Sequence, residues 1–536
     1  MKRVAYFLFL ASSLFLSSLN FMTAQTIKTK IGVISDLHYT HPSLIVEKGA
    51  ALENYLSNDR KLLVESEAIL KETVANLLEE NVNIVLIPGD LTKDGEKVSH
   101  RGVAHLLKPL REKGIKILVI PGNHDINNPE AVRFHGDSTQ QVETISDEEF
   151  AEIYTDYGYG NTISRDKHSL SYVSEPVDGL RILCLDACKY DQNTFVSLED
   201  SHDECITGGA LKPETVEWLR TEMQVARILG KQVLGMIHHN VIEHFAYQSV
   251  FATPYLVDDF TKVQQYFMEY GLNIIFTGHF HSSDIARVSN PYGQSLHEIE
   301  TGSIVTYPCP YRIIDINGEN MAIETKYIEH IDYPLPEGMD FQTYAAQQIE
   351  RGFNEMLRGF IHEYYPTFHA YVPRWARSFV TIPHAEELTD IVMSHLSPSA
   401  LNMLLAHYRG NENLLDHASI NKQELLQNLD DLIDDLAEAT TGKMSALTKS
   451  VVHKLPIIKK VKASAISIWE NVATPESVAA NEYTGGKSQE QLAINDLKLQ
   501  LRFSVPSEYE SHYTHIHIQS KRQEHYAPQL SENKKN

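Results

Sequence analysis

The feature that most constrains the fold is a short apolar strand that ends abruptly in polar residues. Ile117–Asp125 reads ILVIPGNHD, an aliphatic run that stops at a Pro-Gly pair and is followed by Asn123, His124 and Asp125. A continuous apolar run is typical of a strand that is buried on both faces of a parallel sheet. Open α/β sheets bind their ligands at the carboxyl ends of the strands. These polar residues are therefore expected at a binding edge.

The same construction occurs four more times along the chain. Apolar runs end in Asp36-Leu37-His38, Gly89-Asp90, His238-His239 and Gly278-His279-Phe280-His281. Helical patterns over 52–80 and 99–113 separate the first three runs. Strands that alternate with helices form βαβ units, so this part of the sheet should be parallel and right-handed.

Later strands predict a second sheet, and a change of pattern predicts a second domain. Leu296–Val305, Tyr311–Ile316 and Met321–Ile328 read as a meander that closes the second sheet. Beyond Pro334–Gly338 the apolar residues follow helical spacing with polar faces between them, as in a helical bundle. We predict an α/β domain over 27–330, a helical domain over 340–480, and a strand-like tail over 481–536 that packs on the rest and frays at its end.

Composition excludes some classes of partner. Among 536 residues, 47 are Lys or Arg and 71 are Asp or Glu, which gives a net charge of −24. Such a surface repels polyanions, so we expect no stable nucleic-acid binding and no attachment to anionic membranes. A bound metal could still hold one phosphate locally. The apolar fraction of 42% is ample for a folded core.

Residues 1–24 have the three parts of a secretory signal peptide. Lys2 and Arg3 form a charged start, Val4–Leu16 is apolar apart from two serines, and Thr23-Ala24 offers a small-residue cleavage site. A transmembrane anchor is the alternative, although the apolar run is short for one. We expect a secreted or periplasmic protein without a membrane span in its mature form. In such a compartment Cys188 and Cys205, which flank a polar loop, could form a disulfide or remain free.

Metal-ligand residue types gather at the five strand ends. They are Asp36, His38, Asp90, Asn123, His124, His238, His279 and His281. Carboxylate, imidazole and amide groups in one place suit a borderline divalent metal, and eight candidates exceed what one ion uses. A pair of ions needs a bridging carboxylate, for which Asp90 in its tight turn is the natural choice. Two such ions activate a water and clamp an in-line displacement at phosphorus.

Each motif alone has an ordinary explanation. A Gly-Asp pair after a strand is usually a turn or a helix cap, and Asn-His-Asp is commonly a polar loop. Asp-x-His and His-x-His arise by chance at exposed positions. The conjunction of five elements, in order and each just past an apolar strand, favours a metal site over these explanations.

Together the motifs resemble those of the calcineurin-like metallophosphoesterases. The matching elements are D-x-H at Asp36 and His38, G-D at Asp90, G-N-H-D ending at Asp125, a strand-terminal His238, and G-H-x-H at His279 and His281. The resemblance implies a two-sheet αββα sandwich with a dinuclear metal site at the sheet edge, extended here by a C-terminal, mainly helical domain.

The resemblance also implies a ligand set. One ion would take Asp36, His38, Asp90 and His281, and the other Asp90, Asn123, His238 and His279. His124 would face the substrate and protonate the leaving oxygen, which is the usual work of a positioned histidine. Neighbouring strand residues face opposite ways, so only one of His238 and His239 can enter the site, and the family pattern favours His238.

Two details bear on the branch of the family. The purple acid phosphatases have a ligating tyrosine three residues after the Gly-Asp aspartate, where this chain has Lys93, so a tyrosinate–ferric centre is not expected. Thr301–Arg312 (TGSIVTYPCPYR) resembles the cyclic-nucleotide phosphodiesterase-like branch, some exported members of which carry a C-terminal helical domain.

Other polar and aromatic residues receive structural interpretations. His100 and His105 are five apart, do not share a helical face, and are expected to be exposed. Tyr154, Tyr157 and Tyr159 are expected to pack in the core or a loop rather than to stack on a substrate. Tyr307 and Tyr311 follow the last motif and could line the pocket, and His515 and His517 are expected on an edge strand.

We predict an exported phosphoesterase that depends on two divalent metal ions. A metal-bridging hydroxide would attack the phosphorus of a small phosphodiester, of nucleotide or cyclic-nucleotide type. Phosphomonoester hydrolysis on the same fold is one alternative and a non-catalytic binding scaffold is another, although no ligand residue is missing. Ligation by nitrogen and oxygen suits Mn, Fe or Zn. The oligomeric state is left open.

Overall fold

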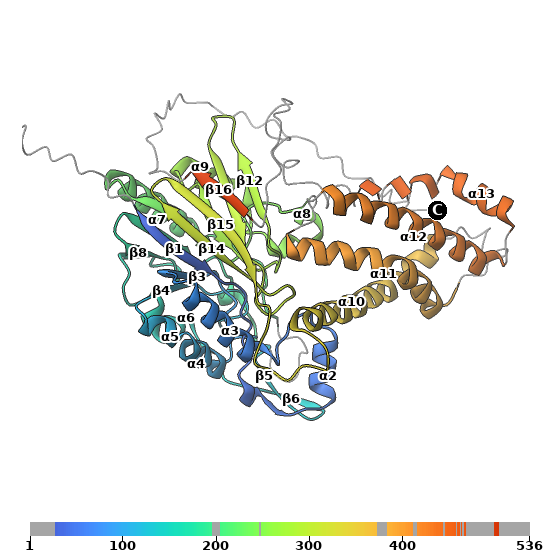
Figure 1. Cartoon of the computed structure of the whole chain (residues 1–536), viewed down its shortest axis with the longest axis horizontal. Coiled ribbons are helices and arrows are strands. Elements are labelled where there is room, and N and C mark those ends of the chain that lie inside the picture. The colour runs from blue at the N-terminus through green and yellow to red at the C-terminus, as the bar shows by residue number, and fades with distance from the viewer. Residues whose placement is uncertain are drawn as a thin grey trace, which may run out of the picture.

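The computed structural model describes residues 27–195, 204–245, 248–371, 383–410, 415–442, 445–456 and 458–460, with short pieces at 462–463, 466–467 and 498–502. The predicted signal peptide, most of the predicted tail, and both His515 and His517 lie outside these residues. The described chain forms a sandwich of two sheets, covered by helices, from which a group of long helices projects (Figure 1).

The predicted parallel strands form the centre of the first sheet. β1 (Lys28–Val33), β3 (Ile84–Ile87) and β4 (Lys116–Val119) lie side by side and parallel, with Ile31 opposite Ile84 and Ile84 opposite Lys116. All residues of β3 are buried, which explains its unbroken apolar sequence. The carboxyl ends of these strands therefore meet at one edge of the sheet, as predicted.

The prediction that the last strands close the second sheet is wrong for two of them. β14 (Pro310–Asn317) pairs antiparallel with β1, and β15 (Asn320–Tyr327) follows it in the first sheet. β1 has a second edge besides the one that β3 occupies, and β14 satisfies its backbone groups there. The sequence pattern identifies strands but not their partners. The sheet order is β16-β15-β14-β1-β3-β4, with β16 at Lys498–Arg502.

The second sheet has the order β12-β13-β11-β10-β9-β8-β7. Its central strands are parallel, with Gly235 opposite Ile275 and Gln232 opposite Leu180. The sequence pattern predicts strands over 169–173, 181–185, 233–237 and 273–276 in this part of the chain, but none that corresponds to β7 or β12. The strands of the second sheet are β7 (Ser164–Arg165), β8 (Tyr172–Val177), β9 (Leu180–Leu185), β10 (Gln232–Ile237), β11 (Ile274–Thr277), β12 (Ile285–Ser289) and β13 (Ser295–Glu300).

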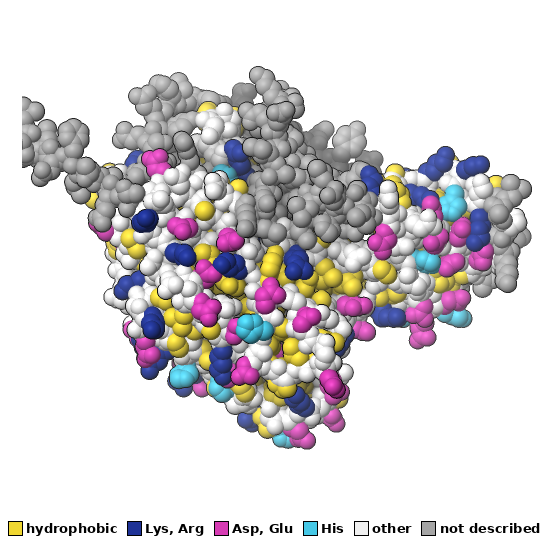
Figure 2. All heavy atoms as spheres, viewed as in Figure 1, with side chains coloured by type: hydrophobic (Ala, Val, Ile, Leu, Met, Phe, Trp, Pro, Cys, Tyr) yellow, Lys and Arg dark blue, Asp and Glu magenta, His cyan; other side chains and the backbone are white. Residues whose placement is uncertain are grey.

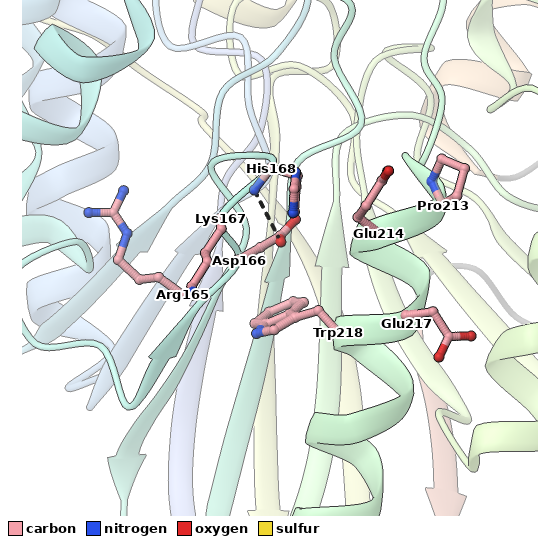
Figure 3. Close-up of a pocket in the computed structure, with 8 residues that line it drawn as sticks. All are labelled: Arg165, Asp166, Lys167, His168, Pro213, Glu214, Glu217 and Trp218. Atoms are coloured by element: carbon pink, nitrogen blue, oxygen red, sulfur yellow. Dashed lines mark hydrogen bonds between the residues drawn. The ribbon is translucent and has the colours of Figure 1, made fainter.

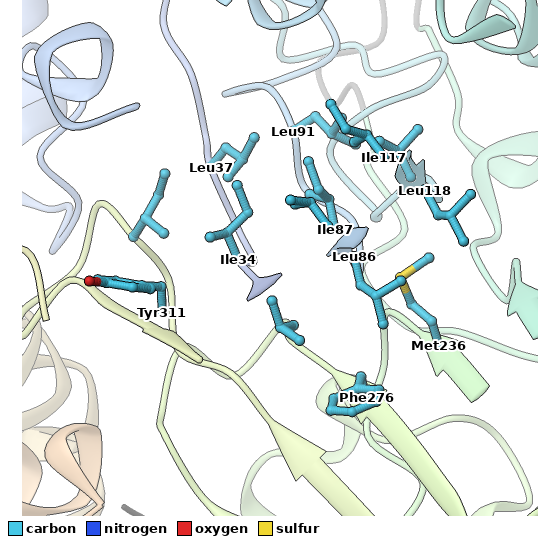
Figure 4. Packing of buried hydrophobic residues seen from close by; sticks show 14 of the residues in the cluster. Ile34, Leu37, Leu86, Ile87, Leu91, Ile117, Leu118, Met236, Phe276 and Tyr311 are labelled. Atoms are coloured by element: carbon cyan, nitrogen blue, oxygen red, sulfur yellow. The ribbon is translucent and has the colours of Figure 1, made fainter. Parts of the chain in front are cut away.

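The core lies between the two sheets and under the helices. Leu86 and Leu118 of the first sheet and Met236 and Phe276 of the second belong to one buried cluster (Figure 4). A second cluster lies between the second sheet and two amphipathic helices, α7 (Pro213–Ile228) and α9 (Phe260–Tyr270). Helices thus cover the outer faces of both sheets, which establishes the predicted αββα class.

Both long helices predicted near the amino terminus are interrupted. The pattern over 52–80 divides into α2 (Ala50–Ser57) and α3 (Ser66–Glu79). Between them Leu62 donates its backbone N–H to Val305 at 2.7 Å, which replaces a bond within a helix. The pattern over 99–113 divides into α4 (Lys97–Leu106) and α5 (Lys108–Glu112), because Pro109 cannot continue a helix.

The polar sequence over 129–161 predicts a loop with one helix, and the structure has a small sheet there as well. A small sheet joins β2 (Ile45–Glu47), β5 (Val132–His135) and β6 (Ser138–Gln141). The helix α6 (Asp147–Ile153) begins at a capping box, in which Ser146 and Glu149 each bind the other's backbone N–H. The strands were missed because β6 is exposed throughout and carries no apolar alternation.

The carboxyl-terminal region is helical. α10 (Phe341–Tyr371) is followed by α11 (Ala385–Arg409), α12 (Leu415–Thr441) and α13 (Ala446–Lys454). The apolar spacing predicts separate helices over Ala385–Leu396 and Pro398–Arg409. The structure has one helix there, with Pro398 inside it. Acidic and basic side chains intermix over the sandwich and these helices (Figure 2). No described helix combines the length and the apolarity that crossing a bilayer requires.

Candidate metal centre

Neighbouring turns at the edge of the first sheet hold one another in place. Asp36 donates its backbone N–H to Gly89 at 3.2 Å, and His38 donates its own to Asp90 at 3.0 Å. The backbone N–H of His124 binds Asp90 Oδ1 at 3.0 Å. Since these turns follow three adjacent parallel strands, the fold itself brings the first three motifs together.

Five of the seven candidate ligands have a strained backbone. The φ angles are positive at Asp36 (50°), His38 (37°), Asp90 (50°), His279 (74°) and His281 (70°). L-residues adopt this region rarely, and such strain gathers at functional sites. Neighbouring glycines permit the crowding, since a Cβ on Gly122 would lie 2.1 Å from Asp90 Oδ1.

The candidate ligands form three overlapping groups. In each group the possible ligand atoms all lie within 4.8 Å of one another. His38 belongs to two groups, and so does Asp90, which gives Asp90 the position expected of a bridging carboxylate. The groups are Asp36 with His38 and His281, His38 with Asp90 and His124, and Asp90 with His238 and His279.

The donor set fits divalent cations. Nε2 of His38 lies 3.1 Å from Nε2 of His281, close enough for one cation to contact both nitrogens, and imidazole nitrogen is a common ligand of such ions. Burial lowers the pKa of both histidines, which favours the neutral form that binds metal. Nδ1 of His38 and Nδ2 of Asn123 are buried without a hydrogen-bond partner.

The structure turns His238, and not His239, toward the cluster. Nε2 of His238 lies 3.4 Å from Asp90 Oδ2 and 3.0 Å from Asn123 Oδ1. Nε2 of His239 instead lies 2.9 Å from the carbonyl oxygen of Thr207. Burial lowers the pKa of His238, but the charge and hydrogen bond of Asp90, together with the charge of Asp36 and the carbonyl of Pro88, outweigh burial and raise the pKa to about 9. A cation at Asp90 therefore competes with a proton on His238.

His124 is oriented by a residue that the sequence analysis did not single out. Nδ1 of His124 lies 2.9 Å from Oδ1 of Asp94, whose side chain is 1% exposed. Burial lowers the pKa of His124, yet Asp90 and Asp94 together raise it above its ordinary value. The spacing of Asp94, four residues after Asp90 in DLTKD, was the available signal.

Asp125 joins two of the turns. Its carboxylate accepts the backbone N–H groups of Gly122 at 2.8 Å, Leu91 at 3.1 Å and Thr92 at 3.0 Å. Burial, followed by the charge of Asp90, raises the pKa of Asp125 to about 7. The last residue of the GNHD motif thus fixes the turn that carries Asp90 relative to the turn that carries His124.

The expectation that His100 is exposed is wrong. It is fully buried, with Nε2 2.8 Å from the carbonyl oxygen of Asp125 and Nδ1 3.0 Å from the hydroxyl of Tyr154. Burial lowers its pKa to about 3, so it is neutral. Helical spacing could not reveal that His100 is buried, because the turn after β4, which is distant in sequence, packs against α4. His105, on the same helix, is exposed as expected.

Lys93, at the position where a tyrosine would ligate iron, has another role. Its ammonium is fully buried, pairs with Asp94 and lies 3.3 Å from Glu96 Oε1. Burial lowers the pKa of Lys93, but these carboxylates raise it well above its ordinary value. Lys93 thus holds Asp94 from the side opposite His124.

The remaining predicted residues lie as follows. Tyr154, Tyr157 and Tyr159 are buried in the main core, as expected. Tyr307 receives a hydrogen bond from Arg409 of α11 at 2.6 Å, and Tyr311 belongs to β14. Cys188 and Cys205 are free thiols.

A hollow of about 460 Å³ lies on another part of the surface (Figure 3). Trp218 of α7 points toward Asp166 of the loop after β7, and Lys167 and Glu217 also line the hollow. None of its lining residues belongs to the metal-ligand cluster. This hollow is therefore separate from the candidate centre.

Comparison with known proteins found matches to curated proteins, to a solved structure and to a family model. Two curated proteins named probable cyclic nucleotide phosphodiesterase match short stretches. That of Vesicomyosocius okutanii subsp. Calyptogena okutanii (strain HA) is 35% identical over 71 residues, which is 13% of this chain and 29% of the relative. That of Ruthia magnifica subsp. Calyptogena magnifica is 37% identical over 65 residues, 12% of this chain and 26% of the relative. The matches thus span less than a third of either relative's length.

A solved dimetal phosphatase from Danio rerio is 16% identical with a TM-score of 0.39, and the alignment covers 56% of this chain and 96% of that one. The model of the calcineurin-like phosphoesterase family matches residues 29–283. That range contains every candidate ligand from Asp36 to His281 and both residues that face them, His124 and Asp94. Residues 29–283 therefore form a calcineurin-like phosphoesterase domain.

Proposed function

We propose that this protein hydrolyses phosphodiesters of nucleotide type with the help of two divalent cations. The observation that carries the proposal is the set of three metal-ligand groups that overlap at His38 and Asp90. Asp36, His38, Asp90 and His281 would hold one ion, and Asp90, Asn123, His238 and His279 the other. When bound, such ions polarise phosphoryl oxygens and lower the pKa of water.

His124 supplies the proton that the leaving oxygen needs. Because Nδ1 is engaged with Asp94, the Nε2 proton of the imidazolium is the one available for transfer. The raised pKa of His124 favours this protonated form. The side chain is 20% exposed, whereas that of Asp94 is 1% exposed, so His124 is accessible to a substrate and Asp94 is not. Asp94 acts through His124, as a positioning residue.

Aromatic rings beside the cluster suit a diester with an aryl or nucleobase group. The ring of Tyr255 lies 4.7 Å from that of His279 and 4.8 Å from that of Phe280. Tyr255 and Phe280 are only partly buried, so they can contact a flat group. The names of the two curated relatives also favour a diester, although the matches are short.

Hydrolysis of bis(p-nitrophenyl) phosphate beside p-nitrophenyl phosphate tests this proposal. The full chain, stripped of metal and refilled with Mn, Zn or Fe, should turn over the diester faster, and Asp90→Ala should abolish the activity. Preference for the monoester would replace the diesterase with a phosphatase. Binding of metal without turnover of either substrate would favour a scaffold.

We also propose that the protein is exported, on the strength of the charged, apolar and small-residue segments of residues 1–24. Fractionation of cells that express the full chain should place it outside the cytoplasm with residues 1–24 removed. A product that retains Met1 and stays in the cytoplasm would overturn this.

A further inference from the structure

Residues 57–62, which end α2 and begin the connection to α3, lie against the metal centre although they carry no ligand. We call them the 57–62 linker. Before it, the ring of Tyr55 lies 5.1 Å from Nζ of Lys93, which holds Asp94 beside His124. At its end, the backbone N–H of Leu62 donates to the carbonyl oxygen of Val305 at 2.7 Å. The residue after Val305, Thr306, places its Oγ1 3.3 Å from Nδ1 of His281. The linker thus spans from the His124 side of the centre to the His281 side.

Lys61 directly precedes Leu62, whose backbone N–H binds Val305 beside Thr306, the residue that contacts His281. The side chain of Lys61 is 12% exposed, and its ammonium lies 3.5 Å from Asp59. That separation is longer than a direct charge-assisted hydrogen bond of about 2.8 Å, so the ammonium retains donors for a ligand.

The carboxyl-terminal helices fix the linker from its outer side. Gln348 of α10 donates to the carbonyl oxygens of Leu56 at 3.1 Å and Asp59 at 3.0 Å. On α11, the hydroxyl of Tyr408 accepts a hydrogen bond from Arg60 at 2.6 Å. The contact is close, since a Cβ on Gly352 of α10 would lie 2.7 Å from the carbonyl oxygen of Asp59.

We propose that Lys61 binds a phosphoryl oxygen of the substrate and that α10 and α11 hold it in position, an inference that rests on the proposed phosphoesterase function. Lysine binds phosphate as a compact point charge, and its long side chain needs support to stay in one place. Such a charge also offsets the repulsion that a protein of net charge −24 exerts on an anionic substrate. The helices thereby become part of the substrate site.

Replacement of Lys61 tests the first half of this inference. In the metal-loaded full chain, Lys61→Gln should raise KM for bis(p-nitrophenyl) phosphate and the inhibition constant of inorganic phosphate by about tenfold or more, as expected for loss of a charge-assisted contact. kcat should change by less than about threefold, and Lys61→Arg should recover most of the affinity. Unchanged KM and unchanged phosphate inhibition in Lys61→Gln would overturn it.

A matched pair of glycines on α10 tests the second half. Gly352→Ala places its methyl group against the backbone of Asp59, whereas a Cβ on Gly359 meets no atom within 4 Å. Gly352→Ala should therefore raise KM in the manner of Lys61→Gln, and Gly359→Ala should leave it unchanged. Equal KM values in the two variants, each folded by circular dichroism, would show that α10 does not position the linker.

Calorimetry separates failure of this inference from failure of the proposed function. Inorganic phosphate should bind the metal-loaded wild-type chain at least about tenfold more tightly than it binds Lys61→Gln. If no substrate is turned over but this difference is found, the proposed function fails and the role of Lys61 stands. Equal binding, or no binding to the wild type, would overturn the role of Lys61 whatever the activity.

Discussion

The sandwich contains fully buried ion pairs, whereas the ion pairs of the described carboxyl-terminal helices are at least partly exposed. In the sandwich, Lys93 pairs with Asp94 and Glu96, and none of the three side chains is more than 1% exposed. In the helices, the ion pair between Arg358 and Asp390 at 3.1 Å joins side chains that are 44% and 70% exposed. Charges inside a protein cost desolvation energy, whereas exposed charges cost little.

The buried charged groups of the sandwich lie beside the loops of the candidate metal centre. A second buried group, His244 with Asp284 at 3.0 Å and Glu298 at 3.1 Å, supports the loop that follows His281. Both buried groups thus adjoin loops that carry ligands or His124. The sandwich buries charges where they support the metal centre, whereas the ion pairs of the described carboxyl-terminal helices have partly exposed side chains.

The largest expected effect compares one aspartate from each region. Asp90→Asn removes the charge shared by two metal-ligand groups, so turnover should fall by about 10⁴-fold or more. Asp390→Asn, on an exposed face of α11, should leave turnover unchanged. Steady-state rates of the two variants, loaded with the same metal, measure this. Substantial activity in Asp90→Asn would show that Asp90 does not bridge the ions.

Loss of the buried cation should be the largest effect on stability. Lys93→Met leaves Asp94 and Glu96 buried without their partner, which should lower the free energy of unfolding by about 3–5 kcal/mol. Urea titration followed by tryptophan fluorescence measures it. A loss below about 1 kcal/mol would mean that protonation or hydration of Asp94 and Glu96 replaces the ion pairs at little cost in free energy.

Removal of the partner of His124 should have an intermediate effect with a defined pH dependence. Burial lowers the pKa of His124 while Asp90 and Asp94 raise it, so Asp94→Asn should lower that pKa. Because the protonated form donates to the leaving group, the alkaline fall in kcat should move to lower pH. At neutral pH kcat should drop by about 10- to 100-fold. An unshifted profile would assign the proton to another group.

The smallest effect should come from the exposed pair. Arg358→Ala removes the ion pair with Asp390, and the free energy of unfolding should change by less than about 0.5 kcal/mol. The same titration as for Lys93→Met measures it, so the two variants compare a buried and an exposed cation directly. A comparable loss in both would remove the contrast between the regions.

Local patterns predicted much of the fold. The apolar runs before Gly89-Asp90 and Pro121-Gly122 were predicted as buried strands and form β3 and β4, because a continuous apolar run is set by nearby residues. The placement of β14 beside β1 was not predicted, since the choice of a strand partner depends on distant parts of the chain. The division of the first long helix likewise depends on Val305, far away in sequence.

The candidate site shows the same limit. Asp36, His38, Asp90, His238, His279 and His281 could be collected from the sequence because each follows a strand. Asp94 and Lys61 do not follow strands, and their roles depend on where His124 and the carboxyl-terminal helices lie. Sequence spacing thus identifies groups at a sheet edge, whereas the groups that orient them or approach from outside require the folded chain.

The position of the strand β16 shows how the carboxyl-terminal helices are connected to the first sheet. It pairs antiparallel with β15, with Arg502 opposite Asn320 and Lys498 opposite Glu324. The chain therefore leaves the first sheet after β15 and returns to the neighbouring position, so the helices are an insertion into a β-hairpin rather than an appendage. Truncation after about residue 334 would also strip an edge strand and uncover the backbone of β15. A short turn that joins residues 327 and 498 would excise the insertion and keep the hairpin.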